Sequence, residues 1–445
     1  MTRTTVSAGM EDAPVNRFHR RIVAVAMGGP FCDGYLLGII AVALPLLTPD
    51  LGVDALWSGL IACSVLVGVF LGGALFGPIT DRVGRHVMYM LNLAAFIAGS
   101  ALQFFVHEPW QLVLLRLFVG VAIGADYPIA SALTTELVPG RLRGPALAGL
   151  VLAWWIGYGV SYWVGWMLQS VPDGWRWMLA SGVVPAAVFL VMRRGIPESP
   201  RWLAARGRVA DARAIVHKYF GPDVDTSELA GERASERRGS GLGNLVEVFR
   251  RGYTVPLVFC SLFWICQVAP AFALRSFQPK MLEAFGVDAT FGGSAIVTTL
   301  AVVGIALSLF VVNRMGRRPL LIGSFVGMCA SLAALIVFPL HIAVLVIGLF
   351  AAFQFFEAAA SGLQFVYPSE LFPTDLRGTG VGIATAMSRV GSAASTFLLP
   401  TATAGLGIGG TLTVGLVITV VGLIVSVVLA PETKNLALTT ASTRT

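Results

Sequence analysis

The sequence is poor in charge. Asp, Glu, Lys and Arg make up 12% of its 445 residues, whereas soluble domains average about 25%. Hydrophobic residues reach 56% and the mean hydropathy is +0.79. A chain this long with so little charge cannot stay in water as a globule, so its excess apolar surface must face lipid. The composition excludes soluble enzymes, coiled coils and disordered scaffolds.

Paired cysteines and catalytic motifs are also lacking. The five Cys residues all lie in apolar stretches, which indicates neither a disulfide framework nor a zinc site. The chain has no His-Glu-x-x-His, no Gly-x-Ser-x-Gly and no phosphate-binding loop, and we interpret the glycine run at 405–410 as a turn. We therefore expect no cofactor, no metal and no nucleic-acid partner, and a membrane enzyme is disfavoured.

Long apolar runs fill most of the chain. A bilayer-spanning helix needs about 20 apolar residues, so twelve helices would use about 240. Charged residues and Pro/Gly breaks divide the sequence into twelve such runs, which predicts an all-α membrane protein. The polar N-terminal segment lacks the cleavage site of a signal peptide, so the first run is expected to be retained. The predicted spans are 22–47, 56–80, 87–106, 111–136, 144–170, 175–195, 253–275, 290–312, 319–339, 341–369, 378–400 and 410–430.

The positions of Lys and Arg predict the orientation. The N-terminal segment, the tail and the loops after spans 2, 4, 6, 8 and 10 contain 26 of the 31 basic residues. The loops on the opposite side contain only Arg176, Arg275 and Lys280. Cytoplasmic loops are enriched in Lys and Arg. We therefore predict that both termini and the long central loop are cytoplasmic, with the chain in the cytoplasmic (inner) membrane.

Three pairs of matching segments indicate an internal duplication. They are 136–144 with 370–378, 197–199 with 431–433, and 81–85 with 313–317, at offsets of 234, 234 and 232. Each pair occupies the same place in a six-span half, which predicts two parallel repeats. The predicted organisation is an N-terminal six-helix bundle over 1–195, a cytoplasmic loop over 196–252 and a C-terminal bundle with a short tail over 253–445.

These segments resemble the motifs of the major facilitator superfamily, most closely its sugar-porter and metabolite/proton-symporter branches. The resemblance is carried by Gly77-x-x-x-Asp81-Arg82-x-Gly84-Arg85, the paired Glu-x-x-Pro-x-x-x-Arg-Gly of 136–144 and 370–378, the PESPRW of 197–202, and Pro431-Glu432-Thr433. It implies two pseudo-symmetric six-helix bundles that rock about a central cavity.

The resemblance also implies a gate at the cytoplasmic ends of the two halves. Acid and Arg clusters can pair across the bundle interface there, and one exposed pair contributes only about 0–1 kcal/mol, so the set biases two states without locking either. The alternative, that the Arg residues are only positive-inside anchors, is disfavoured by the repetition. Because Asn313 replaces the acid of the first copy, the second latch is expected to be weaker. The predicted gating residues are Asp81, Arg82, Arg85, Glu136, Arg143, Glu198, Arg314, Arg317, Glu370, Arg377 and Glu432.

The long loop begins with an amphipathic pattern. Basic residues separate apolar ones at helical spacing, which predicts a helix lying on the membrane or on the underside of the bundle. Residues 221–243 are rich in Gly, Ser, Glu and Arg, and predict a flexible linker. The apolar positions are Trp202, Val209, Ala212, Ile215, Val216 and Tyr219.

Five Asp, Glu or Arg residues lie well inside predicted spans, away from their ends, where charge is expensive and marks a pathway. At 1.5 Å per residue, Asp33, Asp126, Glu357 and Arg389 lie about 15–20 Å from the cytoplasmic ends, near the midplane where such transporters hold substrate. Arg116 lies nearer the outside. A sensor that does not transport would lose these charges, so a transporter is favoured.

Asp33, Asp126 and Arg116 form the predicted proton-coupling set. Neighbouring carboxylates raise each other's proton affinity and a nearby Arg lowers it, so such a site can switch. The alternative is a permanently ionised Asp33–Arg116 pair beside a hydrogen-bonded Asp126. By resemblance, Arg116 corresponds to the span 4 Arg of sugar porters, which pairs with a proton-coupling acid in span 1. That acid's position is Leu36 in this chain, and Asp33 lies about one turn lower.

Glu357 and Arg389, at equal depth on adjacent spans, are expected to form a structural pair. Alternatively, the planar donor fork of Arg389 binds a substrate carboxylate. In place of the Gln-Gln-x-x-Gly-x-Asn of sugar porters, span 7 retains only Gln267. The predicted substrate-binding residues are Arg389, Glu357, Gln267, Trp154, Tyr158, Trp264 and Gln354.

These patterns predict a secondary active transporter that uses alternating access and proton symport, and we expect a monomer. Few neutral hydrogen-bonding groups are evident in the spans, which favours a small organic or aromatic acid as substrate. A sugar or polyol symporter or uniporter is the second hypothesis. A drug efflux antiporter is less favoured, because span 5 lacks the Gly-Pro-x-x-Gly-Gly signature.

Overall fold

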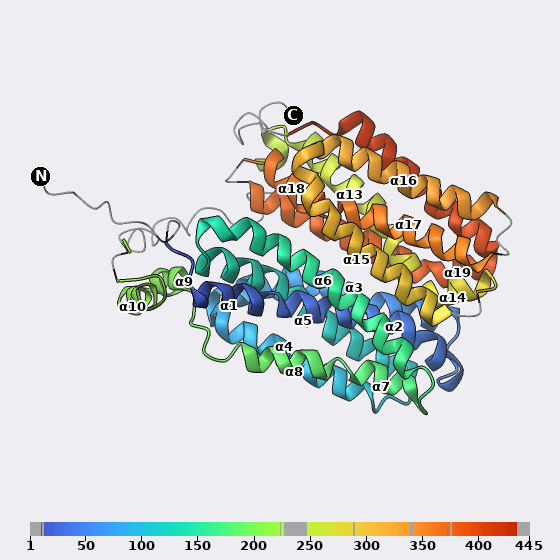
Figure 1. Ribbon diagram of the computed structural model, residues 1–445, viewed down its shortest axis with the longest axis horizontal. Coiled ribbons are helices and arrows are strands. Elements are labelled where there is room, and N and C mark those ends of the chain that lie inside the picture. The colour runs from blue at the N-terminus through green and yellow to red at the C-terminus, as the bar shows by residue number, and fades with distance from the viewer. Residues whose placement is uncertain are drawn as a thin grey trace, which may run out of the picture.

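The computed structural model describes residues 10, 13–222, 224–226, 247–287, 290–338, 342–373 and 376–433. All regular structure in these ranges is helical. Figure 1 shows two groups of roughly parallel helices lying side by side, α1–α8 below and α13–α19 above, with α9 and α10 at one end. That end is called the loop end below. The Lys and Arg distribution predicts it to be cytoplasmic.

The helices of each half follow the predicted spans closely. In the N-terminal half they are α1 (Arg17–Ala26), α2 (Gly28–Asp50), α3 (Ala55–Val83), α4 (Arg85–Gln103), α5 (Pro109–Leu137), α6 (Gly140–Leu168), α7 (Gly174–Ala180) and α8 (Val183–Met192). In the C-terminal half they are α13 (Thr254–Ser276), α14 (Gln278–Ala284), α15 (Thr290–Met315), α16 (Arg317–Val337), α17 (Ala343–Ser361), α18 (Leu363–Leu371) and α19 (Arg377–Leu429). The first span is thus built from α1 and α2, the sixth from α7 and α8, and the tenth from α17 and α18.

Twelve crossings account for these helices. Within the described ranges, ten helical segments are long and apolar enough to cross a membrane. The last of them lies in α19, whose 53 residues are interrupted at Gly407, where φ is +70°. This conformation favours glycine, and it replaces the open turn expected at 405–410 with a break between two helical arms. Dividing α19 there and adding α4 gives the twelve spans of a major facilitator fold.

Glycine allows α3 and α5 to pack with their backbones nearly touching. A methyl group on Gly120 of α5 would overlap the carbonyl of Val65, and one on Gly68 of α3 would overlap the carbonyl of Leu117. Helices in lipid associate through such close packing, because apolar side chains gain little by leaving a hydrocarbon solvent.

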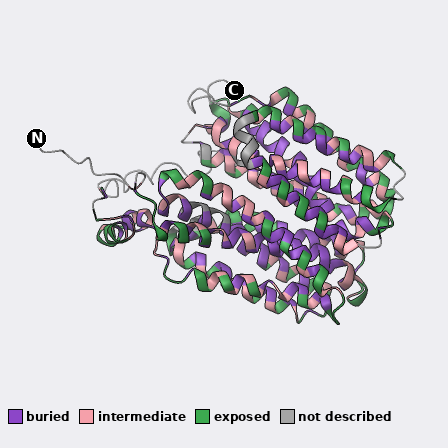
Figure 2. Ribbon diagram, in the orientation of Figure 1, coloured by how far each residue is buried: buried purple, intermediate pink, exposed green. Residues whose placement is uncertain are grey.

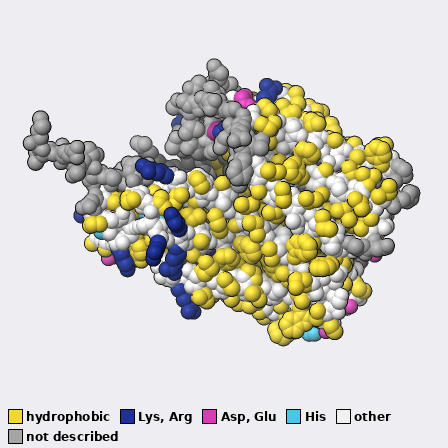
Figure 3. All heavy atoms as spheres, in the orientation of Figure 1, with side chains coloured by type: hydrophobic (Ala, Val, Ile, Leu, Met, Phe, Trp, Pro, Cys, Tyr) yellow, Lys and Arg dark blue, Asp and Glu magenta, His cyan; other side chains and the backbone are white. Residues whose placement is uncertain are grey.

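Buried and exposed residues are distributed as expected for a protein whose outer surface contacts lipid. Figure 2 shows buried residues along the inward faces of the helices in both halves. Large apolar side chains cover much of the visible surface, whereas Lys and Arg gather at the loop end (Figure 3). Val184, Val344 and Val428 are 65%, 80% and 72% exposed. An apolar surface of this extent is stable only against lipid.

The two halves contact each other away from the loop end. The Lys280 ammonium donates to the hydroxyl of Thr48 at 3.1 Å, and the indole N–H of Trp163 donates to the hydroxyl of Thr299 at 3.0 Å. The backbones also approach closely, since a methyl group on Gly59 of α3 would overlap a carbonyl of α19. Each of these residues lies toward the end of its helix remote from α9 and α10.

The predicted amphipathic helix is two helices, α9 (Pro200–Ala205) and α10 (Val209–Tyr219). Between them Gly207 has a φ of +80°, which breaks the helix. The apolar face packs on the start of α1: the Phe18 and Tyr219 rings stack at 4.0 Å, and the amide of Asn16, which caps α1, donates to the Tyr219 carbonyl at 2.7 Å. Most of the predicted flexible linker, from residue 227 on, lies outside the described residues.

Candidate transport site

Asp126 on α5 lies in a fully buried polar cluster of the N-terminal half. Its Oδ1 atom accepts a hydrogen bond from the Asn92 amide at 2.7 Å and forms an ion pair with Arg193 at 3.4 Å. Arg193 directly follows α8 and also donates to the carbonyl of Tyr89. Its guanidinium carbon lies 3.1 Å from the centre of the Tyr89 ring. Asp126 and Arg193 both have no exposed surface.

Asp33 lies beside this cluster on α2. A methyl group on Gly29 would overlap the Asp126 carboxylate, so that carboxylate lies directly against the α2 backbone. Asp33 is four residues further along, on the same face of the helix, and helical side chains lean toward the N-terminal end, which is the Gly29 end. The charges that act on Asp33 are those of Asp126, Arg193 and Arg389. In the described part of the chain, neither oxygen of the buried Asp33 carboxylate accepts a hydrogen bond.

Arg116 is not the cation of this site, in contrast to the sequence prediction. Its Nη1 atom donates to the carbonyl of Leu36 at 3.3 Å, about one turn of α2 beyond Asp33. Leu36 is the position where the resemblance places the acid of sugar porters. The cation beside Asp126 is Arg193, which lies at the end of the sixth predicted span and was counted with the basic residues of the loop that follows it. Two consecutive Arg residues at the end of an apolar run look like a positive-inside anchor, and nothing in the sequence shows that only Arg194 is exposed.

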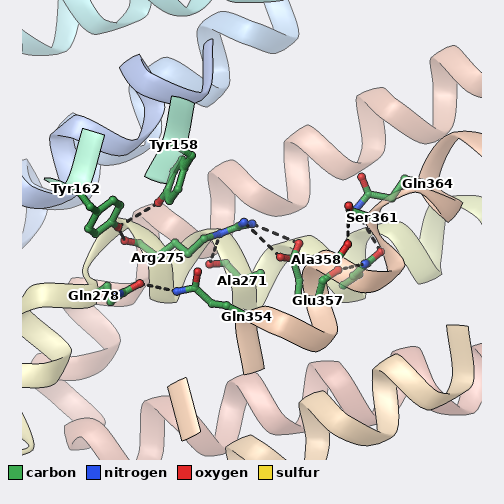
Figure 4. A network of polar contacts seen from close by, with 11 residues as sticks. Tyr158, Tyr162, Ala271, Arg275, Gln278, Gln354, Glu357, Ala358, Ser361 and Gln364 are labelled. Carbon is green, nitrogen blue, oxygen red and sulfur yellow. Dashed lines mark hydrogen bonds and ion pairs between the residues drawn. The ribbon is translucent and has the colours of Figure 1, made fainter. Parts of the chain in front are cut away.

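Glu357 on α17 pairs with Arg275 on α13, not with Arg389 as the sequence predicted. Arg275 Nη1 lies 3.3 Å from Oε2 of Glu357, and Nη2 lies 3.4 Å from Oε1. Both side chains are 2% exposed, and Figure 4 shows them pointing toward each other. Arg275 was assigned to a loop, but α13 continues to Ser276 and keeps it in the bundle. Arg389 lies half-buried on α19.

A chain of buried glutamines extends from this pair. The Gln267 amide donates to the carbonyl of Glu357 at 3.0 Å and its oxygen accepts from Gln364 at 3.2 Å. Gln354 donates to Gln278, which in turn donates to a carbonyl of α15. The sequence analysis missed Gln278 and Gln364, which come from α14 and α18. The half therefore contains more neutral hydrogen-bonding groups than the span 7 comparison indicated.

Aromatic residues of α6 contact the C-terminal ion pair from the other half. Trp154 and Tyr158 stack with ring centres 5.3 Å apart. Tyr162 donates to the carbonyl of Arg275 at 2.8 Å, and the Arg275 guanidinium lies 5.7 Å from the centre of the Tyr158 ring (Figure 4). Trp264 is 1% exposed among the core residues of α13, which favours a packing role over the predicted stacking on substrate.

The predicted gating residues of the N-terminal half form one cluster at the loop end. Arg85 pairs with Glu136, which also accepts a hydrogen bond from Ser199. Glu198 accepts hydrogen bonds from the backbone N–H groups of Arg85 and His86, at 3.1 and 3.0 Å. Its carboxylate thus lies at the start of α4, where the helix dipole favours negative charge.

The C-terminal half repeats this arrangement. Arg317 pairs with Glu370 at 3.1 Å, Thr433 donates to Glu370, and Glu432 accepts from the backbone N–H groups of Arg317 and Arg318, both at 3.1 Å. These pairs connect helices of one half, whereas the sequence predicted pairing across the bundle interface.

Fewer contacts are described for the remaining predicted gating residues. The side chains of Asp81, Arg314 and Arg377 lie outside the described residues. Arg82 is exposed and its carbonyl accepts a hydrogen bond from Arg206 at 2.8 Å. Arg143 is half-buried.

Comparisons with known proteins agree with this fold. Residues 22–444 match the family model described as "Sugar (and other) transporter". The putative metabolite transport protein YaaU of Escherichia coli (strain K12) is 37% identical over 442 residues, which cover 99% of this chain and 98% of the relative. The inner membrane metabolite transport protein YgcS of the same strain is 37% identical over 433 residues, covering 97% and 96%.

A solved structure shows the same fold. The xylose transporter XylE from E. coli, in a partially occluded inward-open conformation, matches with a TM-score of 0.81 at 20% identity, covering 95% of this chain and all of that one. The family model spans nearly the whole chain, and two relatives exceed 30% identity over almost all of it. The chain therefore belongs to the sugar (and other) transporter family of the major facilitator superfamily, and it is a multi-pass membrane transporter rather than an enzyme.

Proposed function

We propose that the chain imports a small organic acid together with a proton, by alternating access across the inner membrane, with both termini in the cytoplasm. One observation carries this proposal: the fully buried Asp33 carboxyl of the N-terminal half accepts no hydrogen bond in the described part of the chain, and Arg389 of the C-terminal half lies within electrostatic range of it. A carboxyl of one half and a guanidinium of the other can load a proton and an anion together. The domain boundaries predicted above and a monomeric state belong to this proposal.

The proton site is Asp33, with Asp126 as its neighbour. Asp33 is fully buried and its carboxylate oxygens have no hydrogen-bond donor in the described part of the chain. An ionised carboxylate in such surroundings costs several kcal/mol, whereas the neutral acid does not. A proton on Asp33 is therefore stable when the site is closed, and it can leave when water or a conformational change brings donors to the carboxylate.

Arg389 is the residue that binds the substrate carboxylate. Arg389 lies on the arm of α19 that borders the N-terminal half, because Phe397, about two turns further along, meets Gly59 of α3. In this proposal the substrate anion binds the Arg389 guanidinium through two parallel hydrogen bonds while Asp33 carries the proton. Proton and anion then move as a neutral pair.

A sugar or polyol is the second candidate substrate. The buried glutamines Gln267, Gln278, Gln354 and Gln364 supply the neutral groups that a sugar requires, and XylE is a xylose transporter with this fold. In the structure, however, these amides bind one another and backbone carbonyls. A sugar would have to replace these hydrogen bonds, whereas an anion requires a cation, which Arg389 supplies.

A paired-ligand screen tests the substrate class. Purified protein is heated with benzoate, nicotinate and lactate, with the amide of each acid, and with xylose and xylitol. We expect at least one acid to raise the unfolding temperature, its amide not to do so, and Arg389→Gln to abolish the shift. The exposed residue Arg194 provides the matched control, Arg194→Gln. Stabilisation by a sugar that survives in Arg389→Gln would reject the organic acid in favour of the second candidate.

The two loop-end clusters are the proposed gate. Arg85, Glu136 and Glu198 fix the loop end of one half, and Arg317, Glu370 and Glu432 fix that of the other. Because each cluster stiffens its own half, the halves can rock as units while the contacts between them change.

A further inference from the structure

Arg193 is held as a structural element rather than as a surface charge. Its guanidinium is fully buried and is fixed by the Asp126 carboxylate, the carbonyl of Tyr89 and the face of the Tyr89 ring. The next residue, Arg194, has the same charge but is exposed. Burying a guanidinium is costly unless it is paired, so the position of Arg193 requires an anionic partner, and that partner is Asp126.

The two neighbouring acids have unlike surroundings. Asp126 receives a hydrogen bond from Asn92 and the charge of Arg193, whereas Asp33 receives no hydrogen bond in the described part of the chain. The first set of contacts favours a carboxylate and the second favours a neutral acid. The charged and titratable groups that face the two acids are Cys32 on α2, Tyr89 on α4, Arg193 after α8 and Arg389 on α19.

We propose that Arg193 is a positioning residue that keeps Asp126 ionised and thereby confines the transported proton to Asp33. This rests on the proposed proton symport. Two adjacent buried carboxyls with one local cation can hold one negative charge, and the position of that cation decides which of them is ionised. The proton is taken up by the Asp33 carboxylate and leaves from it to water, while Asp126 does not change its protonation during transport.

The same segment connects the proton site to the gate. Arg193 begins the stretch 193–199, at the other end of which Glu198 binds the start of α4 and Ser199 binds Glu136. Asp126 and Glu136 lie ten residues apart on α5, or about 15 Å. This stretch is therefore attached to α5 at two depths, so a movement of the loop-end cluster also moves Arg193 relative to the acids.

Infrared spectroscopy of the purified, substrate-free protein tests the assignment, because a protonated carboxyl has its own C=O stretching band. At neutral pH we expect the wild type to show a band that Asp33→Asn removes and Asp126→Asn leaves in place. Arg193→Gln should add a second protonated carboxyl, which the double variant Arg193→Gln with Asp126→Asn lacks. Arg194→Gln, the matched exposed control, should leave the spectrum unchanged.

The outcomes separate the two proposals. A wild-type band that Asp126→Asn removes, or an unchanged spectrum in Arg193→Gln, would overturn the role of Arg193. If Arg193→Gln does not fold, the Asp33→Asn and Asp126→Asn spectra still decide which acid carries the proton, and Arg193→Lys should reproduce the wild type. Spectra as expected, combined with a pH gradient that never drives uptake of any screened compound, would leave the assignment standing and reject the proton symport.

Discussion

Each half of the molecule buries one Arg–carboxylate pair, and the two pairs differ in their charge balance. In the C-terminal half, Glu357 uses both oxygens against both terminal nitrogens of Arg275, one acid for one cation. In the N-terminal half, Arg193 reaches only one oxygen of Asp126, and Asp33 adds a second acid to the same cluster. A balanced buried pair needs no proton, whereas two acids with one local cation do. We therefore propose a structural role for the C-terminal pair and proton chemistry for the N-terminal one.

The glutamines strengthen this contrast. The C-terminal pair is surrounded by amides that bind the carbonyl of Glu357 and one another, which fixes a single arrangement. The N-terminal cluster has one such amide, Asn92, and it binds Asp126 and not Asp33. A network with more hydrogen bonds stiffens a protein, whereas a cluster that leaves both oxygens of a carboxyl without donors can change its protonation.

The largest expected effect follows from removing the unbalanced acid. Asp33→Asn leaves the Asp126–Arg193 pair intact but provides no carboxyl to carry the proton. In proteoliposomes, uptake against a gradient driven by pH should fall to background, while counterflow exchange at equal pH continues. Asp126→Asn should also reduce uphill uptake, because it leaves the buried Arg193 guanidinium beside the proton site without its carboxylate partner. Uphill uptake that is unchanged in Asp33→Asn would remove the distinction between the two halves.

Breaking the balanced pair should mainly cost stability. Arg275→Gln leaves the Glu357 carboxylate buried without a cation, and such losses amount to about 3–5 kcal/mol. The double variant Arg275→Gln with Glu357→Gln removes both charges and should recover most of that loss. Thermal unfolding of both proteins in detergent measures the effect. Equal unfolding temperatures for the single and double variants would mean that the pair is not a closed structural unit.

The positions of the spans along the chain could be predicted from the sequence, but the partner of each charge could not. Hydropathy and the repeated motifs located the spans and the gating clusters, because both are properties of consecutive residues. Glu357 and Arg389 were predicted to lie at similar heights and to pair, yet the rotation of α13 brings Arg275 to Glu357. Helix rotation depends on packing among all neighbours, which a single sequence does not display.

The surroundings of charged residues at the ends of spans could not be predicted from the sequence for a related reason. Arg193 and Arg275 each lie at the boundary of an apolar run, and both were counted as loop residues. In the structure, α8 ends at Met192 and α13 at Ser276, and both guanidinium groups turn inward to a buried carboxylate. Long Arg side chains reach several ångströms from their backbone, so a boundary position fixes neither the depth nor the direction of the charge.

A smaller effect is expected where the α2 backbone meets Asp126. Gly29→Ala places a methyl group in the space of the Asp126 carboxylate, and overpacking of this kind costs about 1–3 kcal/mol. The displaced carboxylate should also weaken uphill uptake. Gly348→Ala on α17, where a methyl group meets nothing within 4 Å, is the matched control. Similar unfolding temperatures for the two variants would show that Asp126 does not lie against α2.

The smallest effect should be the same in both halves. Glu198→Gln and Glu432→Gln each remove a negative charge that two backbone N–H groups bind at the start of a helix, α4 or α16. A charge at that position contributes about 0.3–1 kcal/mol, so each variant should lose a similar small amount of stability, and exposed Glu283→Gln should lose none. The motif-based expectation was a weaker second latch. Equal losses would mean that the two halves differ in their buried ion pairs and not at the gate. A clearly smaller loss for Glu432→Gln would mean that they differ at the gate as well.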